Sequence, residues 1–582
     1  MNNTSLESRD VLKFGFYIAL VAMIWNLPNL GNNLMPRNFL GWFGMIVISS
    51  LVLANAIVQK KILFSRFIVI SFIPTSAILV HGMLFPPSET MTYYMWLALS
   101  ASVIFPIFLL SLFQIDDDDK VWLSVSNLLL GVYLFQVLMT EFLYEFSYFR
   151  FLIQQLPIEL RAKEAGFQQV NLMASFGAAL LLWSWSLRLK LSHTGFKSWA
   201  FLIVGAFILS LMVFKSGSRT AGLSLLIGAS FIFIYSFQFK KSFFSFAVVG
   251  SILTAFLFQS FGVLELAGID GARRGAFASA VTDLAADDSA NGRLIMWHVS
   301  FLAGLNNMFF GNGLGSFSQA YYETYAINFD NYDYFWRHIP NIMHPHNELL
   351  IHWVEMGLFG VMLVALPAIF FLLLLIVRRS SYSVLLISSM LPIVIHSQTE
   401  MVLHASGWHW FLLGLIFSSL ISRDWLSSYR LPSSVIVAPI FLGLFGCYST
   451  LSIAHISSQA WLNKTSADRA QNLGLHLKRL TQGDELNHWI FATETNDRVI
   501  KIMMGYALNT KNTQAIRKFL PRLVDMNNRW QQVDAWAMIA QAYLSLGDMD
   551  AYKKHMGKVS KFDATFAVSL SKQFDIKVNP AN

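Results

Sequence analysis

The chain has 582 residues, of which 55% are hydrophobic and 13% are charged, and its mean hydropathy is +0.51. This composition excludes soluble, collagen-like, disordered and disulfide-scaffold proteins, and it indicates a membrane protein. The net charge is +8, but the basic residues are scattered, so we expect no nucleic-acid partner. The single cysteine, Cys447, lies in an apolar run and excludes an intrachain disulfide.

Apolar runs long enough to cross a bilayer recur along the chain and predict an all-α polytopic membrane protein. The first run follows Arg9 and Lys13 but has no small-residue cleavage site after it, so we expect a retained helix. The runs predict about 13 transmembrane helices, near residues 14–27, 38–58, 67–85, 92–113, 121–139, 170–187, 198–214, 220–237, 242–262, 346–377, 381–395, 406–421 and 434–454.

The distribution of Lys and Arg predicts the orientation of these helices, because short cytoplasmic loops retain an excess of them. With the N-terminus in the cytoplasm, the inner loops carry most of these residues, among them Lys61, Arg188, Lys190, Lys241 and Arg430. An odd number of spans then puts the C-terminus outside, together with two long loops, 140–169 and 263–345. We therefore expect the chemistry on the extracytoplasmic face.

The tail, residues 455–582, has a composition of its own and is predicted to be a separate domain from residues 1–454. It contains 17 Lys and Arg against 11 Asp and Glu, so it carries +6 of the net charge of +8. Trp536, Tyr543, Gly547 and Asp548 have the spacing of a tetratricopeptide-like helix–turn–helix unit, and a weaker copy lies about 36 residues earlier. Such repeats usually bind a protein partner, although a purely stabilising helical cap is the alternative.

Histidine and arginine are the candidate functional residues of the outer face. Seven of the 14 histidines lie between His338 and His409, and His344-Pro345-His346-Asn347 precedes a long apolar helix that we expect to carry His346 and Asn347 on its first turn. A neutral imidazole can take a proton from a hydroxyl group. A metal site is the alternative, but two histidines at i and i+2 do not share a helix face, so we expect no metal. Arginines on this face suit an anionic phosphate partner, with a salt bridge in a loop as the alternative.

Six motifs in order resemble the O-antigen ligase and Wzy polymerase superfamily and, within it, the bacterial O-linked protein oligosaccharyltransferases of the pilin glycosylation type. The motifs are Gln168-Gln169-Val170-Asn171; Ser216-Gly217-Ser218-Arg219-Thr220; Asn291-Gly292-Arg293 with Trp297; Gly311-Asn312-Gly313-Leu314-Gly315-Ser316-Phe317; His344-Pro345-His346-Asn347 with Glu355 and Gly357; and His396-Ser397-Gln398-Thr399-Glu400 with Leu403.

The resemblance implies transfer of a preassembled glycan from undecaprenyl pyrophosphate to a hydroxyl group of a pilin-like protein, on the periplasmic face of the bacterial inner membrane. It implies no metal and no nucleotide cofactor. By motif, His346 would be the base, with His344 as the other candidate. The pyrophosphate would be held by Arg219, Arg293 and Arg161, and the site would be lined by Gln169, Asn171, Asn347, His396 and Glu400.

Two other functions fit the sequence. An O-antigen ligase or polymerase would use a sugar hydroxyl as the acceptor, but such enzymes commonly lack a large soluble tail. A lipid-linked glycan transporter would also have many spans, and His81, Glu141 and Glu145 in or near spans are its best support. A transporter should place polar residues near the middle of its spans, often in two similar halves, and this sequence shows neither.

Overall fold

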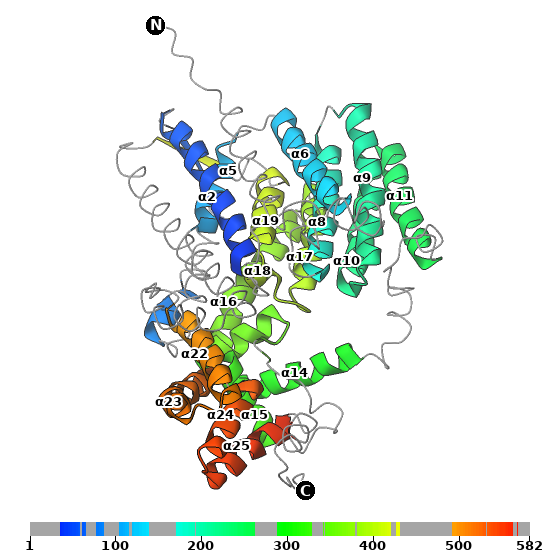
Figure 1. Cartoon of the computed structure of the whole chain (residues 1–582). Coiled ribbons are helices and arrows are strands. Elements are labelled where there is room, and N and C mark those ends of the chain that lie inside the picture. Colours follow the sequence, from blue (N-terminus) through cyan, green and yellow to red (C-terminus); the bar gives the residue numbers. More distant parts are fainter. Residues whose placement is uncertain are drawn as a thin grey trace. The chain divides into compact units, whose positions relative to one another are not determined.

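The structure, a computed structural model, is helical in almost all of the residues that it describes (Figure 1). The described residues are 35–58, 61–65, 77–78, 80–85, 104–115, 119–138, 170–191, 194–261, 288–328, 342, 344–378, 381–420, 426–430, 492–530, 532–562 and 567. The chain divides into two compact units. The first, which we call the bundle unit, comprises Met1–Ser76, Leu99–Asp287 and Ala365–Asn463. The second, which we call the histidine–tail unit, comprises Ala77–Ala98, Asp288–Val364 and Lys464–Asn582.

The bundle unit holds most of the apolar helices. Its described elements are α2 (Met35–Val58), β1 (Lys61–Ser65), α5 (Phe105–Phe113), α6 (Asp119–Val137), α8 (Val170–Lys190), α9 (Phe196–Lys215), α10 (Arg219–Ser236), η6 (Phe237–Phe239), α11 (Ser242–Ser260), α17 (Ser381–His396), α18 (Val402–Ala405), α19 (Gly407–Leu420) and β2 (Leu426–Arg430). Helix α16 (Glu348–Arg378) contributes its last part to this unit and its first part to the other.

Helix α8 lies at the centre of the bundle unit, where it packs against α6, α9, α10, α17 and α19. Its most apolar stretch is 100% buried, against 50% for that of α9 and 28% for that of α11. A helix that is apolar on every side belongs in the middle of a bundle. Its few polar side chains bond to neighbouring helices, since Ser184 accepts from Ser126 at 3.0 Å and Ser186 accepts from Ser389 at 2.9 Å.

Hydrogen bonds between α8 and α19 show that these two helices run parallel. Ser175, near the start of α8, contacts His409 on the first turn of α19, with Oγ and Nε2 3.0 Å apart. Further along both helices, the Trp183 indole donates to the hydroxyl of Ser419 at 2.8 Å. The starts of α8 and α19 therefore lie at the same end of the bundle unit.

Helix α10 starts at that same end, because short connections make α8, α9 and α10 alternate in direction. Helix α17 runs antiparallel to α10. Thr399, just after α17, bonds to Thr220 on the first turn of α10, with their hydroxyl oxygens 3.3 Å apart. Further along α10, the backbone of Gly228 lies against the carbonyl of Ser388 in α17. We call the end that holds Asn171, Arg219, His396 and Glu400 the polar end.

The opposite end of the bundle unit gathers basic residues that the sequence assigns to cytoplasmic loops. Lys241 donates to the carbonyl of Arg188 at 2.8 Å and also to that of Leu191, and Lys190 donates to the carbonyl of Ser419 at 2.7 Å. Lysine at a helix C-terminus satisfies carbonyls that have no partner within the helix. We call this the basic end. The basic residues of the predicted cytoplasmic loops thus lie at the end opposite Asn171, Arg219, His396 and Glu400, as the predicted topology requires. Which end faces the cytoplasm stays a prediction.

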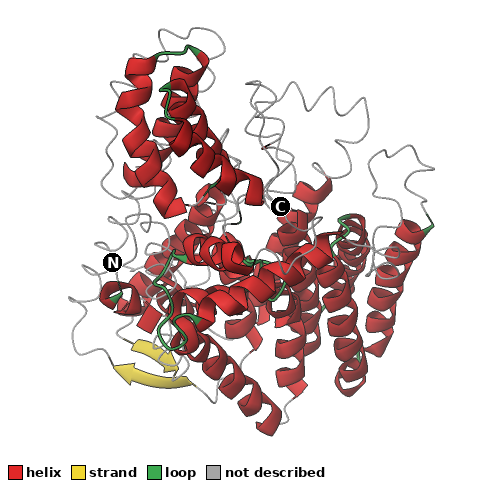
Figure 2. Cartoon of the chain, turned by 90° about the horizontal axis from the view of Figure 1, so that it is seen from below, coloured by secondary structure: helices red, strands yellow, loops and turns green. Residues whose placement is uncertain are grey.

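Two predicted loops form a short antiparallel ribbon, which corrects the all-α prediction at this one place in the described residues (Figure 2). Strand β1 pairs with β2 in a register that sets Ile62 opposite Tyr429 and Lys61 opposite Arg430. Pairs of β-branched and aromatic residues favour such a ribbon, whereas like charges do not. The pairing brings the two loops together, and the sequence assigns both of them to the cytoplasmic face.

Six helices in the described residues are long and apolar enough to cross a membrane, in agreement with a multi-pass protein. They lie within α6, α8, α9, α10 with η6, α11 and the first part of α16. Helices α2, α17 and α19 contain shorter apolar stretches. The predicted spans 14–27 and 434–454 lie outside the described residues, as do most of 67–85 and about half of 92–113. The total of about 13 spans stays a prediction.

The histidine–tail unit combines the end of the long loop with the C-terminal tail. Its helices are α14 (Asp288–Leu305), α15 (Phe317–Asn328), the first part of α16, α22 (Ala492–Asn509), α23 (Thr513–Trp530), α24 (Val533–Ser545) and α25 (Met549–Phe562). The four tail helices form two helix–turn–helix hairpins. Helices α22, α23 and α24 share an apolar core that includes Met504, Leu520 and Ile539, and α25 packs on α24.

The turns of the two hairpins are equivalent at the predicted spacing. Asn512 accepts from the amide of Ala515 at 3.0 Å, and Asp548 accepts from that of Ala551 at the same distance. Each capping residue follows a residue with positive φ, Lys511 at 50° and Gly547 at 82°. The repeated hairpin is thus present in the structure, while its tetratricopeptide class and the domain boundary at 454/455 stay predictions.

Candidate active site

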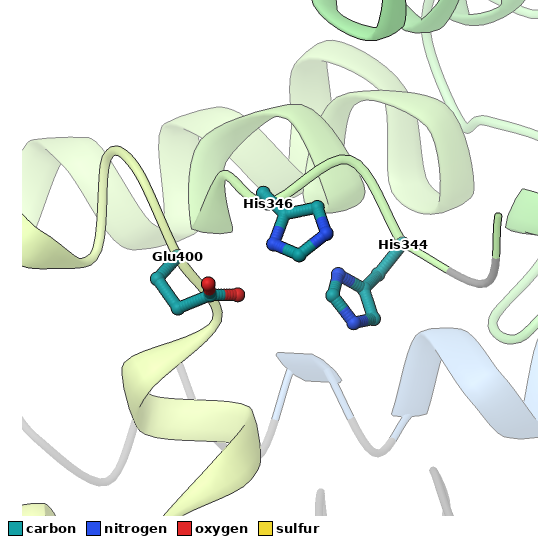
Figure 3. A group of neighbouring side chains, drawn as sticks. All are labelled: His344, His346 and Glu400. Carbon is teal, nitrogen blue, oxygen red and sulfur yellow. The ribbon is translucent and has the colours of Figure 1, made fainter. Parts of the chain in front are cut away.

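The segment His344-Pro345-His346 lies directly before α16 in the histidine–tail unit. The imidazole rings of His344 and His346 have centroids 4.3 Å apart at an interplanar angle of 66°, and both side chains are half-buried (Figure 3). His346 adopts a left-handed conformation with φ of 51°. It therefore precedes the helix and is not on its first turn, which corrects the prediction from the sequence. Glu400, also drawn in Figure 3, belongs to the bundle unit.

Asn347 is the N-cap of α16. Its side-chain oxygen accepts from the amides of Leu349 at 2.9 Å and Leu350 at 3.0 Å, which would otherwise lack partners at the helix start. This oxygen is therefore engaged with the helix.

Helix α14 holds the same segment from another side. The indole of Trp297 donates to the carbonyl of Pro345, the residue between the two histidines, at 3.0 Å. Arg293 lies one turn earlier on α14, and residues at i and i+4 share a helix face. The half-buried guanidinium of Arg293 is thus on the face of α14 that meets the histidine segment.

Helix α16 is broken at Gly357, where φ is 63° and ψ is −155°. The predicted span 346–377 is therefore not one regular helix. The break leaves backbone groups without helical partners, and the turn after α14 satisfies them. The amide of Asn312 donates to Val354 at 3.0 Å and that of Gly313 to Glu355 at 2.9 Å.

The same turn also accepts hydrogen bonds from beyond the break. The amide of Leu358 donates to the carbonyl of Met308 at 2.7 Å. A Cβ at Gly311 would lie 2.3 Å from the backbone of Glu355, so only glycine permits this approach. His81 anchors the turn, since its Nε2 donates to the carbonyl of Phe310 at 2.8 Å. The glycine-rich motif thus has a structural role, and so does His81.

Arg219 opens helix α10 at the polar end of the bundle unit. Gly217 makes the preceding turn with φ of 71°, and the side chain of Ser218 caps the helix by accepting from the amide of Ala221 at 3.4 Å. The side chain of Arg219 is partly exposed. A helix N-terminus and a guanidinium both favour an anion, so this position suits a phosphate group.

His396 and Glu400 lie beside this helix start. His396 ends α17, and its carbonyl accepts from the amide of Glu400 at 2.8 Å. Both side chains are buried, with exposures of 1% and 4%. The contact between Thr399 and Thr220 joins their turn to the residue next to Arg219. The structure therefore brings Arg219, His396 and Glu400 together within one unit.

Asn171 is at the same end, on the first turn of α8. It is one turn from Ser175, which contacts the wholly buried His409, so it shares the face of α8 that packs on α19. Arg161 and Gln169 lie outside the described residues, and their roles stay predictions.

The two histidines supply two nitrogen atoms within one unit. A zinc site takes three or four protein ligands, so this pair alone does not make one. The expectation of no metal stays a prediction.

Sequence reasoning missed the residues that hold the site together. Trp297 was part of a motif, yet only its spacing from Arg293 hinted at its place on α14. Thr220 directly follows Arg219, and Thr399 directly precedes Glu400. Nothing in the sequence indicates that these two threonines, 179 residues apart, are in contact.

A comparison with known protein families finds a match for the part of the chain that contains several of these residues. Residues 204–365 match the family described as O-antigen ligase. This part of the chain is similar to the O-antigen ligase family. The matched range includes Arg219, Arg293 and the segment from His344 to Asn347. No curated protein matches the chain. This similarity supports the predicted superfamily and implies a glycan-transferring membrane enzyme.

Proposed function

We propose that the protein is an O-oligosaccharyltransferase of the bacterial inner membrane. It moves a preassembled glycan from undecaprenyl pyrophosphate to a Ser or Thr hydroxyl of a pilin-like protein on the periplasmic face. The observation that carries the proposal is the pair His344 and His346, anchored through Pro345 to Trp297 one turn from Arg293, inside the range that matches the O-antigen ligase family.

The chemistry assigned to His346 is general-base catalysis. The hydroxyl oxygen of the acceptor forms a bond to the anomeric carbon of the glycan while the bond from that carbon to the pyrophosphate breaks. The hydroxyl proton passes to the imidazole, and the electron pair of the broken bond leaves with the phosphate oxygen. A positioned base typically contributes about 10²–10⁴-fold. A single displacement of this kind inverts the configuration of the anomeric carbon.

His346 is preferred to His344 because it is adjacent to the capping residue Asn347, which fixes the backbone on one side. His344 would then orient its neighbour through the ring contact at 4.3 Å.

Arg219 and Arg293 are assigned to the pyrophosphate, together with Arg161. Their charges compensate the negative charge that builds up on the leaving phosphate, which is where electrostatic stabilisation is most effective. Asn171, Gln169, Asn347, His396 and Glu400 are proposed to line the site. The reaction needs no nucleotide, because the pyrophosphate linkage already carries the energy of transfer. The absence of a metal requirement is part of the proposal and rests on the resemblance to the family.

The tail, residues 455–582, is proposed to be a periplasmic tetratricopeptide-like domain that binds the acceptor protein. Support comes from the two equivalent hairpins and from the +6 charge of the tail. Residues 1–454 form the transferase domain, with the N-terminus in the cytoplasm. The separation of polar and basic ends in the bundle unit supports this topology.

A second candidate is an O-antigen ligase or polymerase, which uses a sugar hydroxyl as acceptor. Its support is the description of the matched family, which is compatible with both candidates. The chemistry at His346 would be the same, and only the acceptor would differ.

Co-expression distinguishes these functions. In cells that make an undecaprenyl-pyrophosphate-linked glycan, we expect a co-expressed pilin-like protein to gain the mass of that glycan on a Ser or Thr, as measured by mass spectrometry of the intact protein and its peptides. An unmodified acceptor beside newly capped lipopolysaccharide or a lengthened glycan would favour the second candidate. The His346→Ala variant at equal membrane level is the matched control.

A further inference from the structure

The tail helices pack directly on the loop helix α15 within the histidine–tail unit. Tyr322 of α15 and Trp536 of α24 have ring centroids 6.2 Å apart at 75°, and α15 also packs on α23. Both rings are buried, with exposures of 2% and 4%. Edge-to-face aromatic pairs in buried positions fix the relative placement of two elements. The repeat hairpins and α15 are therefore a joined structure.

The same tyrosine also holds the chain just before the histidines. Its hydroxyl accepts from the amide of Ile342 at 2.7 Å, and the hydroxyl of Ser318 donates to the carbonyl of Ile342 at 3.1 Å. Ser318 and Tyr322 are one turn apart and so share a face of α15. Both backbone groups of Ile342 are thus fixed by one helix, and Ile342 itself is buried.

Ile342 lies two residues before His344, and Trp297 bonds the carbonyl of Pro345. The histidine segment is therefore held on both sides of His344, by α15 on one side and by α14 on the other. Proline between the histidines limits the backbone further, because its φ is fixed. Loss of the Ile342 anchor would remove the hold that α15 provides on the side preceding His344.

From this arrangement we propose that Tyr322 is a positioning residue for the two histidines and that the tail acts on catalysis through it. The route is Trp536 to Tyr322 to Ile342 to His344, through one ring contact and one hydrogen bond. The proposal rests on the function assigned to the histidines above, and it gives the tail a role besides binding the acceptor: keeping the imidazoles in the geometry that transfer requires. A small displacement of a catalytic group costs rate and not binding.

The test uses the full-length protein in detergent with the variant Tyr322→Phe. This change keeps the ring against Trp536 and removes only the hydroxyl. Tyr552→Phe is the matched control, because the buried hydroxyl of Tyr552 has no hydrogen-bond partner among the described residues. Two quantities are measured: hydrogen exchange of the peptide that contains the Ile342 amide, and kcat and KM for glycan transfer.

For Tyr322→Phe we expect the Ile342 amide to exchange at least about tenfold faster, because it loses its buried acceptor. We expect kcat to fall about tenfold and KM to stay within twofold. In the His346→Ala background, Tyr322→Phe should lower kcat no further, because both changes act on the same catalytic group. Trp536→Ala should speed the same exchange and lower kcat, and Trp536→Phe should recover most of both. Tyr552→Phe should change neither.

Unchanged exchange at Ile342 in Tyr322→Phe would overturn the anchor, and faster exchange with unchanged kcat would overturn its effect on catalysis. If the wild-type protein transfers no glycan, the proposed function fails instead. The exchange of Ile342 in Tyr322→Phe and Trp536→Ala then still decides whether the tail holds this segment.

Discussion

His346 combines a reactive side chain with an uncommon backbone conformation. Its φ of 51° lies in the left-handed region, which costs most residues of order 1–3 kcal/mol and which persists where the surroundings enforce it. Here the surroundings are the cap at Asn347 and the indole bond to Pro345. Strain of this kind concentrates at functional sites, because it aims a side chain in a direction that a relaxed turn would not give.

Replacement of arginine by lysine tests the phosphate assignment. Arg219→Lys and Arg293→Lys keep the charge but lose the planar fork that bonds two phosphate oxygens. We expect each to weaken use of the lipid donor by about 1.5–3 kcal/mol, or roughly 10- to 150-fold in kcat/KM. The exposed Arg517 of α23 is the control, and Arg517→Lys should leave donor use unchanged. Wild-type kinetics in both variants at normal membrane levels would make these arginines structural.

Much at the residue scale followed from the sequence. The motifs identified Arg219, His396 and Glu400 separately, and the structure brings them to one end of the bundle unit. The turn conformation of His346 was not predicted. Pro345 is compatible with a helix that starts at His346, but the N-cap is Asn347, one residue after His346. The anchors Trp297 and Tyr322 were not found as such, since an aromatic residue in an apolar chain has no distinguishing pattern.

At the scale of single elements, the break in α16 at Gly357 decides how the loop after α14 docks. A Cβ at Gly357 would lie 2.5 Å from the carbonyl oxygen of Met308, and the positive φ is itself unfavourable for alanine. We expect Gly357→Ala to lower stability by about 2–3 kcal/mol, as measured by the thermal unfolding midpoint in detergent. Gly250→Ala in α11 is the control, because a Cβ there meets no atom within 4 Å. Equal midpoints for both variants would contradict the docked arrangement.

The hairpin of α24 and α25 should lose stability in mild acid. Burial, and then the nearby Lys558 and Lys554, lower the pKa of His555 below its ordinary value of 6.5. The unfolded hairpin then binds more protons than the folded one below pH 6.5, so stability is present above that pH and is lost as the pH falls. We expect protection of α25 amides, corrected for intrinsic exchange, to fall between pH 7.5 and 5.5 in the wild type and much less in His555→Phe, which keeps a ring against Tyr543. The same fall in both proteins would assign the effect to another group.

Apolar runs predicted most helices of the bundle unit, because a membrane helix can be recognised from its length and apolar composition. The ribbon of β1 and β2 was not predicted, since its strands are separated by some 360 residues of sequence and five-residue segments carry little pattern. The break in α16 was not predicted for a similar reason, because the backbone partners of Gly357 come from another part of the chain.

For the whole molecule, the proposed mechanism depends on which face the tail occupies. The positive-inside rule predicts that residue 582 is in the periplasm. An alkaline phosphatase fused after residue 582 should be active, and a reporter that works only in the cytoplasm should be inactive at the same position. A fusion after Lys241, at the basic end, should give the reverse pattern. An inactive phosphatase at the C-terminus would overturn the assignment of faces.

The central claim is that His346 is the base for transfer of a lipid-linked glycan to a protein hydroxyl. The most direct measurement is transfer by purified protein in detergent, with an undecaprenyl-pyrophosphate-linked glycan and a purified pilin-like acceptor, in the presence of a chelator and without nucleotide. The account predicts glycosylated acceptor from the wild type, reduced but measurable product from His344→Ala, and loss of about 10²–10⁴-fold from His346→Ala with donor binding intact. Product from His346→Ala at the wild-type rate would contradict it.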